Sequence, residues 1–404
     1  MATGCERMTR PGSKQLVVLN PFPVYPPISG GQGRVFYLYK YLADYFDITL
    51  ISFAAARSYK VLSPGFRQIT VPKSPAHCRL ELDFFQEIGF ATCAVLPRAA
   101  GLTPEYAYVV REQSKDANAL ILSHPYLYNE VQNIGFSRTM IYDAHNVEYD
   151  LQRQNLPANV NYLLEDVKQA EQAACRHSQL IAACSRIDAD ILAKYYHIPA
   201  EKFIVVPNGA DTHSIPFIPY EQRLLQKASG SPAKSTVIYM GSNFPPNLQA
   251  ARQVLEIAGQ LPAVRFWLLG SICESFVKQD LPGNVDLLGV MSEQEKYQAL
   301  SLADIALNPI LSGSGTHLKL LEYMAAGLPV ITTLLGARGI CEADSCLLII
   351  CECRDMPARI LDLLNDHRQA VHMTQQAYQL VNTSFSWSHI ASNLAGKLSA
   401  IISR

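Results

Sequence analysis

The sequence predicts an α/β protein made of two Rossmann-like domains. Three observations lead to this prediction. The chain has 404 residues, which is long for one core; short apolar runs alternate with helical patterns; and the alternation starts afresh near residue 237. The apolar runs are continuous, as in strands of a parallel sheet covered on both faces. We expect the first domain at 1–210 and the second at 211–384.

In the first half, apolar runs predict strands and the patterns between them predict helices. Several prolines between 64 and 97 indicate that 53–98 is a variable region of helices and loops. Asn208-Gly209 predicts a turn that closes this half. The expected strands are 16–19, 48–52, 119–124, 140–145, 180–185 and 203–206, and the expected helices are 35–45, 163–175 and 186–196.

The second half opens with a stretch at 215–234 whose proline, serine and glycine content is typical of a linker. A last helix from about 385 to 404 carries apolar residues at helical spacing. Between them we expect strands at 237–241, 265–270, 285–289, 305–309 and 330–333, and helices at 250–260 and 293–302.

The stretch 311–333 carries the pattern that says most about chemistry. A loop of small residues at 312–316 precedes a helical pattern, which Gly327 and Pro329 end. Unpaired N–H groups and the positive end of a helix dipole would meet in that loop, which suits a phosphate.

Lys319 would stand over the same site, and Glu322 shares its helix face. The ammonium group would bind a diphosphate, and the carboxylate could accept hydrogen bonds from two ribose hydroxyls. This set fits a nucleoside diphosphate. The simpler alternative is a capped amphipathic helix with a solvated Lys-Glu pair.

Polar or glycine-rich segments also follow several predicted strands, where open α/β sheets place ligands. Gly30-Gly31-x-Gly33 forms a predicted loop after the first strand, although its spacing is not that of a dinucleotide fold. His124 and His145 each end a strand; either could be functional, and we favour His124. An ordinary turn and surface histidines are the alternatives.

Composition excludes several classes of function. The net charge is −1, which gives no reason to expect a nucleic acid partner. The ten cysteines lack paired metal spacing, and we find no signal peptide, so we expect a cytoplasmic protein with reduced thiols. No apolar run reaches about 20 residues, so we expect at most peripheral contact at the inner face of the membrane. Asp188-Ala189-Asp190 lies in a predicted helix, so we interpret it as solvated charge and expect no metal site.

The motifs together resemble the donor-site signature of the retaining GT-B glycosyltransferases of family 4. The similarity extends along nearly the whole chain, through the Gly-Gly loop, the two histidine segments and the Pro-Asn-Gly segment. The signature residues are Gly313, Gly315, Lys319, Leu321-Glu322, Ala325-Ala326, Gly327, Pro329 and Val330.

The resemblance implies a GT-B fold, with two domains facing across a cleft and the last helix crossing back to the first. It implies a hexosyltransferase-type enzyme (EC 2.4) that moves a sugar from a nucleotide-diphosphate sugar to an acceptor hydroxyl, with retention, in glycan, polysaccharide or glycoconjugate biosynthesis. We expect a UDP- or GDP-sugar donor, a glycan, lipid-linked or small-molecule acceptor, and no metal or cofactor. The nucleotide base is not readable, because the family meets it through backbone groups.

The resemblance also assigns site residues. His124, Lys319 and Glu322 would be catalytic, and His124 and His145 would lie on the acceptor side. The donor would contact Gly30, Gly31, Asn208, Gly241, Ser242, Gly289, Val290, Gly313, Ser314, Gly315, Thr316, Lys319 and Glu322.

Two departures from the commonest family pattern leave alternatives open. The segment 241–247 lacks the Arg and Lys that often reach the diphosphate, and Ser314 replaces the first of two glutamates. A nucleotide-sugar epimerase of GT-B fold and a non-catalytic nucleotide-sugar-binding relative are therefore kept as alternatives.

Overall fold

The structure is a computed structural model that describes residues 13–228, 234–312, 316–340 and 347–402. Contacts divide the chain into two compact units. Unit 1 contains the described residues up to Pro26, Val35–Val206 and those from Ala391 onward, and unit 2 contains Pro27–Arg34 and Pro207–Ile390. The first turn of helix α1 (Gly30–Leu42) thus belongs to unit 2, and helix α15 (Trp387–Ile402) begins in unit 2 and ends in unit 1.

In the described residues, unit 1 is built on an eight-stranded sheet in the order β3-β4-β2-β1-β5-β6-β7-β8. All its pairings are parallel except β3 with β4. The strands are β1 (Gln15–Asn20), β2 (Asp47–Ala54), β3 (Ser58–Ser63), β4 (Phe66–Pro72), β5 (Ala119–Leu122), β6 (Thr139–Ala144), β7 (Leu180–Ala183) and β8 (Phe203–Val205).

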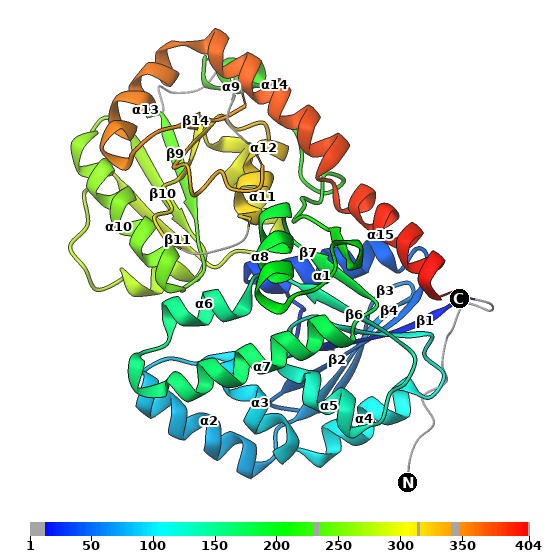
Figure 1. Cartoon of the computed structure of the whole chain (residues 1–404). Helices are drawn as coiled ribbons and strands as arrows, with labels where there is room; N and C mark the ends of the chain where they lie inside the picture. Colours follow the sequence, from blue (N-terminus) through cyan, green and yellow to red (C-terminus); the bar gives the residue numbers. More distant parts are fainter. Residues whose placement is uncertain (1–12, 229–233, 313–315, 341–346, 403–404) are drawn as a thin grey trace. The chain divides into compact units, whose positions relative to one another are not determined.

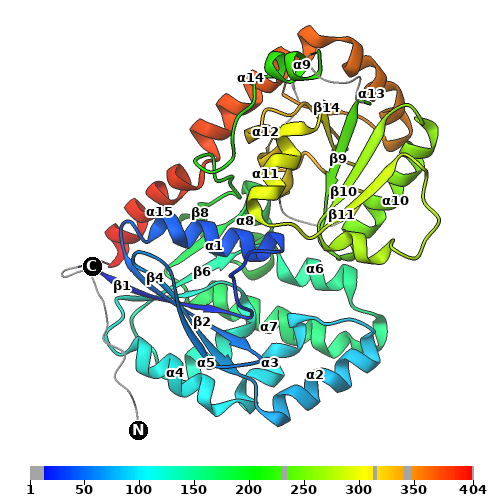
Figure 2. The ribbon, with the colours of Figure 1, turned by 180° about the vertical axis from the view of Figure 1, so that it is seen from behind.

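Helices cover both faces of this sheet. Figures 1 and 2, seen from opposite sides, show α1 on one face and α5 and α7 on the other. Besides α1, the helices are α2 (Pro75–Ile88), α3 (Leu96–Ala99), α4 (Pro104–Ser114), α5 (Tyr128–Asn133), α6 (Glu148–Asn155), α7 (Asn161–His177) and α8 (Arg186–Tyr196).

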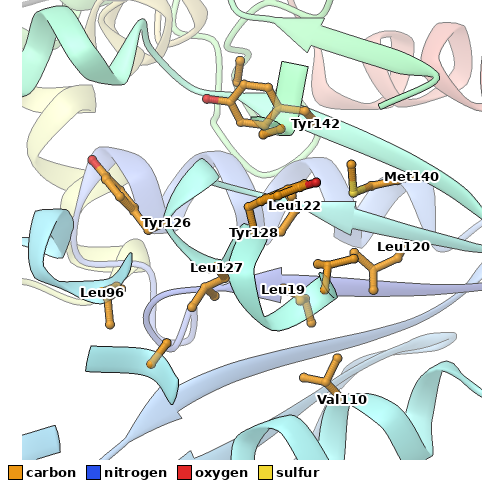
Figure 3. Close-up of a cluster of buried hydrophobic side chains, with 14 of the residues drawn as sticks. Leu19, Leu96, Val110, Leu120, Leu122, Tyr126, Leu127, Tyr128, Met140 and Tyr142 are labelled. Atoms are coloured by element: carbon orange, nitrogen blue, oxygen red, sulfur yellow. The ribbon is translucent and has the colours of Figure 1, made fainter. Parts of the chain in front are cut away.

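Alternate strand residues of unit 1 build its core. Leu19, Leu120 and Leu122 point to the face where Val110 of α4 and Leu127 pack, as Figure 3 shows. These side chains are almost completely removed from water. Burial of the apolar area stabilises the unit and holds the carboxyl ends of β1, β5 and β6 at one edge.

In the described residues, unit 2 is built on a six-stranded parallel sheet in the order β11-β10-β9-β12-β13-β14. The strands are β9 (Thr236–Met240), β10 (Arg265–Leu269), β11 (Val285–Gly289), β12 (Ile305–Asn308), β13 (Val330–Thr332) and β14 (Ile349–Ile350). The helices are α9 (Tyr220–Ala228), α10 (Pro245–Gln260), α11 (Glu293–Leu302), α12 (Leu318–Ala325), α13 (Met356–Asn365) and α14 (His367–Ser384).

Each face of this second sheet has its own core. Val237 and Tyr239 of β9 pack with α10 and α13, whereas Ile238 and Met240 pack with α11 and α12. Gly327 has a φ of +74° just beyond α12, as the sequence predicts, and this conformation ends the helix before β13.

Three local predictions are wrong. Residues 53–98 contain strands β3 and β4 before α2, because Pro64 lies in the turn between the two strands and Pro72 is the last residue of β4, where prolines are tolerated. Gly30 and Gly31 form the first turn of α1 and not a loop, since Ser29 accepts the Gly33 N–H at 2.8 Å. The linker-like stretch 215–234 contains helix α9.

Two further findings concern membrane-spanning helices and the segment Asp188-Ala189-Asp190. No helix among the described residues is long and apolar enough to cross a bilayer. Asp188 is buried and accepts a 2.7 Å hydrogen bond from Ser185 at the start of α8, so it is not the solvated charge that we predicted.

Candidate functional site

The carboxyl edge of the unit 2 sheet holds a tight turn after β9. Gly270, with a φ of +104°, approaches so closely that a Cβ atom there would lie 2.3 Å from the carbonyl oxygen of Gly241. Asn247, in the first turn of α10, donates to both the carbonyl and the hydroxyl oxygen of Ser242 at 3.1 Å. The turn is therefore fixed from both sides, with the backbone of Gly241 and Ser242 in a defined position.

Lys319 of α12 reaches this turn from the neighbouring connection. Its Nζ donates to Asn247 Oδ1 at 2.8 Å and to the Tyr239 hydroxyl at 3.3 Å, and it lies 4.5 Å from the centroid of the Tyr239 ring. Burial lowers the pKa of Lys319 to about 7, although the nearby Glu322 carboxylate opposes the shift. No described carboxylate forms an ion pair with it.

Glu322 is engaged elsewhere. Lys296 of α11 donates to Glu322 Oε1 at 2.8 Å, and both side chains are 19% exposed. Burial alone would lower the pKa of Lys296, but the Glu322 carboxylate raises it overall. The Lys319–Glu322 pair, our simpler alternative for this helix, is thus replaced by a Lys296–Glu322 pair.

The entrance to α12 is fixed by Asn208. Its side-chain amide donates to the Thr316 carbonyl at 2.9 Å and hydroxyl at 2.7 Å, and its oxygen accepts from the buried Arg34 at 3.1 Å. His317 follows at the helix cap, where burial and the positive charges of Lys319 and Arg338 lower its pKa to about 3. His317 is therefore neutral at physiological pH.

The remaining predicted donor residues lie elsewhere in unit 2. The backbone near Gly30 approaches α12: a Cβ atom at Gly30 would lie 3.6 Å from the Leu318 side chain. Gly289 ends β11 with a φ of +70°, and Val290 beyond it is 57% exposed. Gly313, Ser314 and Gly315 lie outside the described residues.

In unit 1, the two predicted histidines meet at the ends of β5 and β6. Their rings lie 4.2 Å apart between centroids, and both side chains are buried. His145 Nε2 lies 3.1 Å from the Ser123 hydroxyl and 3.3 Å from Asp143. His124 Nδ1 lies 3.3 Å from Glu148, whereas its Nε2 has no hydrogen-bond partner among the described residues.

Glu148 is held by a buried polar network. It accepts from the Tyr126 hydroxyl at 2.5 Å and from Asn146 at 3.2 Å, in addition to the contact with His124. Burial alone would raise the pKa of Glu148, but these contacts lower it to about 2.

A second buried carboxylate supports the first. Glu171 accepts the N–H groups of Glu148 and Tyr149 at the start of α6, at 2.7 and 3.2 Å, and the Tyr196 hydroxyl at 2.7 Å. Burial raises the pKa of Glu171 to about 7, and the neighbouring Glu148 charge adds to the shift. The Glu148 backbone is thereby anchored as well as its side chain.

Sequence reasoning missed five of these groups: Tyr239, Asn247, Lys296, Glu148 and Glu171. Glu148 alone had a local signal, because it stands three residues after His145 just beyond a predicted strand. Lys296 lies 26 residues before Glu322, and only the fold brings these two together. In the described part of the chain, no three His, Cys, Asp or Glu side chains converge as a metal ion would require.

Comparison with known proteins agrees with this architecture. Residues 234–366, which include the Lys319 region, match the family model described as glycosyl transferases group 1. A phosphatidyl-myo-inositol mannosyltransferase from Mycolicibacterium smegmatis is 25% identical over 230 residues, which is 54% of this chain and 57% of that protein. Residues 234–366 are therefore similar to the glycosyl transferases group 1 family.

Solved structures confirm the GT-B fold. HepE from Anabaena, in complex with UDP and glucose, superposes with a TM-score of 0.70 at 14% identity, covering 96% of this chain and 100% of HepE. Sucrose-phosphate synthase from Thermosynechococcus elongatus gives a TM-score of 0.76 at 14% identity, with 96% and 99% coverage. The predicted GT-B fold is confirmed, whereas membership of family 4 and retention stay predictions.

Proposed function

We propose that this protein transfers a hexose from a UDP- or GDP-sugar to an acceptor hydroxyl, with retention at the anomeric carbon and without a metal ion, in glycan, polysaccharide or glycoconjugate biosynthesis in the cytoplasm. One observation carries the proposal: the ammonium group of Lys319 is partly buried beside the fixed turn at Gly241. It forms no ion pair with a carboxylate among the described residues. Such a group favours binding of an anion.

The chemistry follows from this charge. The bond between the anomeric carbon and the diphosphate oxygen breaks, a bond to the acceptor oxygen forms, and the proton of the acceptor hydroxyl passes to the departing diphosphate. Negative charge grows on the departing diphosphate, and Lys319 would stabilise it where it develops. One preorganised group of this kind is worth on the order of 10²–10³ in rate.

The other residues would bind and orient. Glu322 would exchange its contact with Lys296 for the ribose hydroxyls, and the backbone of Gly289 and Val290 would meet the base. His124 would use its free Nε2 to hydrogen-bond the transferred sugar or the acceptor. The UDP- and UDP-glucose-bound forms of HepE support a nucleotide-sugar ligand for this fold.

A thermal-shift panel with UDP, GDP, ADP, CDP and TDP tests the donor site, on the native chain and on Lys319→Met. We expect stabilisation by UDP or GDP that the variant loses. An equal shift in both proteins would contradict the role of Lys319. A second assay distinguishes transfer from epimerisation: in transfer, the nucleotide is released from the cognate sugar donor only when an acceptor is added. Binding without turnover would favour a non-catalytic relative.

A further inference from the structure

A cavity of about 370 Å³ opens in unit 1 beside the ends of β1 and β2. Its walls are Pro21, Phe22, Pro23, Phe53, Ala54, Ala55, Lys73 and Cys78. Six of these eight residues are apolar and carry no side-chain polar atom. A concave site of a few hundred Å³ with mostly apolar walls is typical of a small-molecule pocket.

The single cation in this wall is already neutralised. Lys73 Nζ donates to both carboxylate oxygens of Glu81, at 2.7 and 2.6 Å. Burial alone would raise the pKa of Glu81, but contacts with His77 and Lys73 lower it, so the carboxylate stays ionised. His77 is fully buried and bridges Glu81 at 3.3 Å and Thr103 at 3.0 Å, which holds the pair in place. An anionic ligand would have to displace Glu81.

One wall residue links the cavity to the histidine cluster. The Phe22 ring contacts the ring of His124, with 5.6 Å between centroids. His124 is also the histidine whose Nε2 has no partner among the described residues. A molecule seated in the cavity would therefore pack against a ring that itself packs on His124, so the cavity lies next to the histidine cluster.

We propose that this cavity binds an uncharged apolar portion of the acceptor, such as an alkyl or aryl group, and thereby selects amphiphilic acceptors over free sugars and over anionic ones. The inference rests on the proposed transferase function and adds the chemical class of its second substrate. Each methylene group transferred from water to such walls should improve acceptor binding about fourfold.

The test compares methyl and phenyl glucosides, and a glucoside ending in a carboxylate, as acceptors for the full chain. For the native protein we expect kcat/KM at least about tenfold higher with the phenyl than with the methyl compound, and lowest with the carboxylate. Ala55→Trp, which fills the cavity from an exposed position, should abolish the phenyl preference. Ala200→Trp, at an exposed position outside the cavity, is the matched control.

A second variant tests whether the Lys73–Glu81 pair disfavours anionic acceptors. Glu81→Gln leaves Lys73 without its counter-ion, so it should raise kcat/KM for the carboxylate compound several-fold. Equal rates with methyl and phenyl acceptors, or a native preference for the carboxylate, would overturn the proposal. Donor-site binding is measured separately, by the UDP or GDP thermal shift: a normal shift without phenyl preference refutes the cavity proposal alone.

Should no glucoside accept a sugar, saturation-transfer NMR on the same compounds reads out the cavity directly. Stronger saturation of the phenyl protons than of the sugar protons, lost in Ala55→Trp but kept in Ala200→Trp, supports binding of the apolar group in the cavity, whereas the donor assays decide separately whether the protein is a transferase. Equal saturation in all three proteins contradicts it.

Discussion

Lys319 in unit 2 and Glu148 in unit 1 are both charged groups held away from water, but their surroundings differ. Glu148 accepts hydrogen bonds from Tyr126 and Asn146 and contacts His124, and its pKa falls to about 2. Lys319 contacts only neutral oxygens among its described partners, and its pKa falls to about 7. Both shifts are downward, yet one marks a stabilised charge and the other a destabilised one.

The difference separates two roles. A charge that the fold satisfies contributes to stability and fixes its neighbours, here His124. A charge that the fold leaves without a counter-ion lowers stability and favours a ligand of opposite sign. The following predictions test this contrast, from the largest expected effect to the smallest.

Lys319→Met should lower kcat/KM for transfer on the order of 10²–10³-fold, because the leaving diphosphate loses its cation. The melting temperature of the ligand-free protein should stay the same or rise, since a partly buried charge without a described counter-ion is removed. Steady-state kinetics and calorimetry measure the two effects. Lys278→Met, at an exposed position, is the control; full activity in Lys319→Met would refute the contrast.

Glu148→Ala should have the opposite signature on stability. The free energy of unfolding should fall by about 1–3 kcal/mol, because Tyr126 and His124 keep their burial but lose their acceptor. Denaturant titration at pH 7 measures it, with the exposed Glu201→Ala as control.

The acid dependence sharpens this second prediction. The folded-state pKa of Glu148 is depressed, so its contribution is present above its ordinary value of 4.5 and is lost as the pH falls toward about 2. The difference between native protein and Glu148→Ala should therefore shrink below pH 4.5. A nucleotide-induced thermal shift weakened in Glu148→Ala would contradict the separation of roles.

Nucleotide binding should weaken as the pH rises. The folded, ligand-free pKa of Lys319 is about 7, so above that pH the amine is mostly neutral and its protonation must accompany binding of the diphosphate. We expect Kd to increase about tenfold between pH 7 and 8.5, measured by titration calorimetry. Lys319→Arg, which stays charged, should show no such dependence; a flat profile in the native protein would contradict the low pKa.

Glu322→Gln should weaken only the recognition of the ribose hydroxyls. The native protein should bind the ribonucleotide at least about tenfold more tightly than its 2′-deoxy form, because one hydrogen bond to a carboxylate is lost. In Glu322→Gln this preference should nearly disappear, while the pH dependence of the previous prediction persists. The same preference in both proteins would mean that Glu322 serves only its ion pair with Lys296.

Much of the fold could be predicted from sequence periodicity. The helix expected at 186–196 has the bounds of α8, and the restart of the pattern near residue 237 coincides with the first strand of the second sheet. The sequence did not predict the edge strand β3 and its neighbour β4, because β3 is mostly exposed and β4 alternates buried with half-buried residues, so neither forms a continuous apolar run. Gly30 was misassigned because a glycine-rich helix start looks like a loop.

The site divides in the same way. Lys319 and Glu322 could be named from local spacing, and the group 1 family match includes both positions. Their partners Asn247 and Lys296 could not, since these lie 72 and 26 residues away along the chain. Sequence order alone does not show that the Lys319 side chain is partly buried and lacks a described counter-ion.

The antiparallel hairpin of β3 and β4 has a consequence for the behaviour of the chain in solution. An open parallel sheet presents unpaired backbone groups that can recruit a strand from another molecule. Here the outermost strand is β3, which is short, exposed over most of its length, interrupted by a bulge near Val61 and carries Lys60. These features discourage further strand addition at this edge, and removal of residues 58–63 would make β4 the outermost strand.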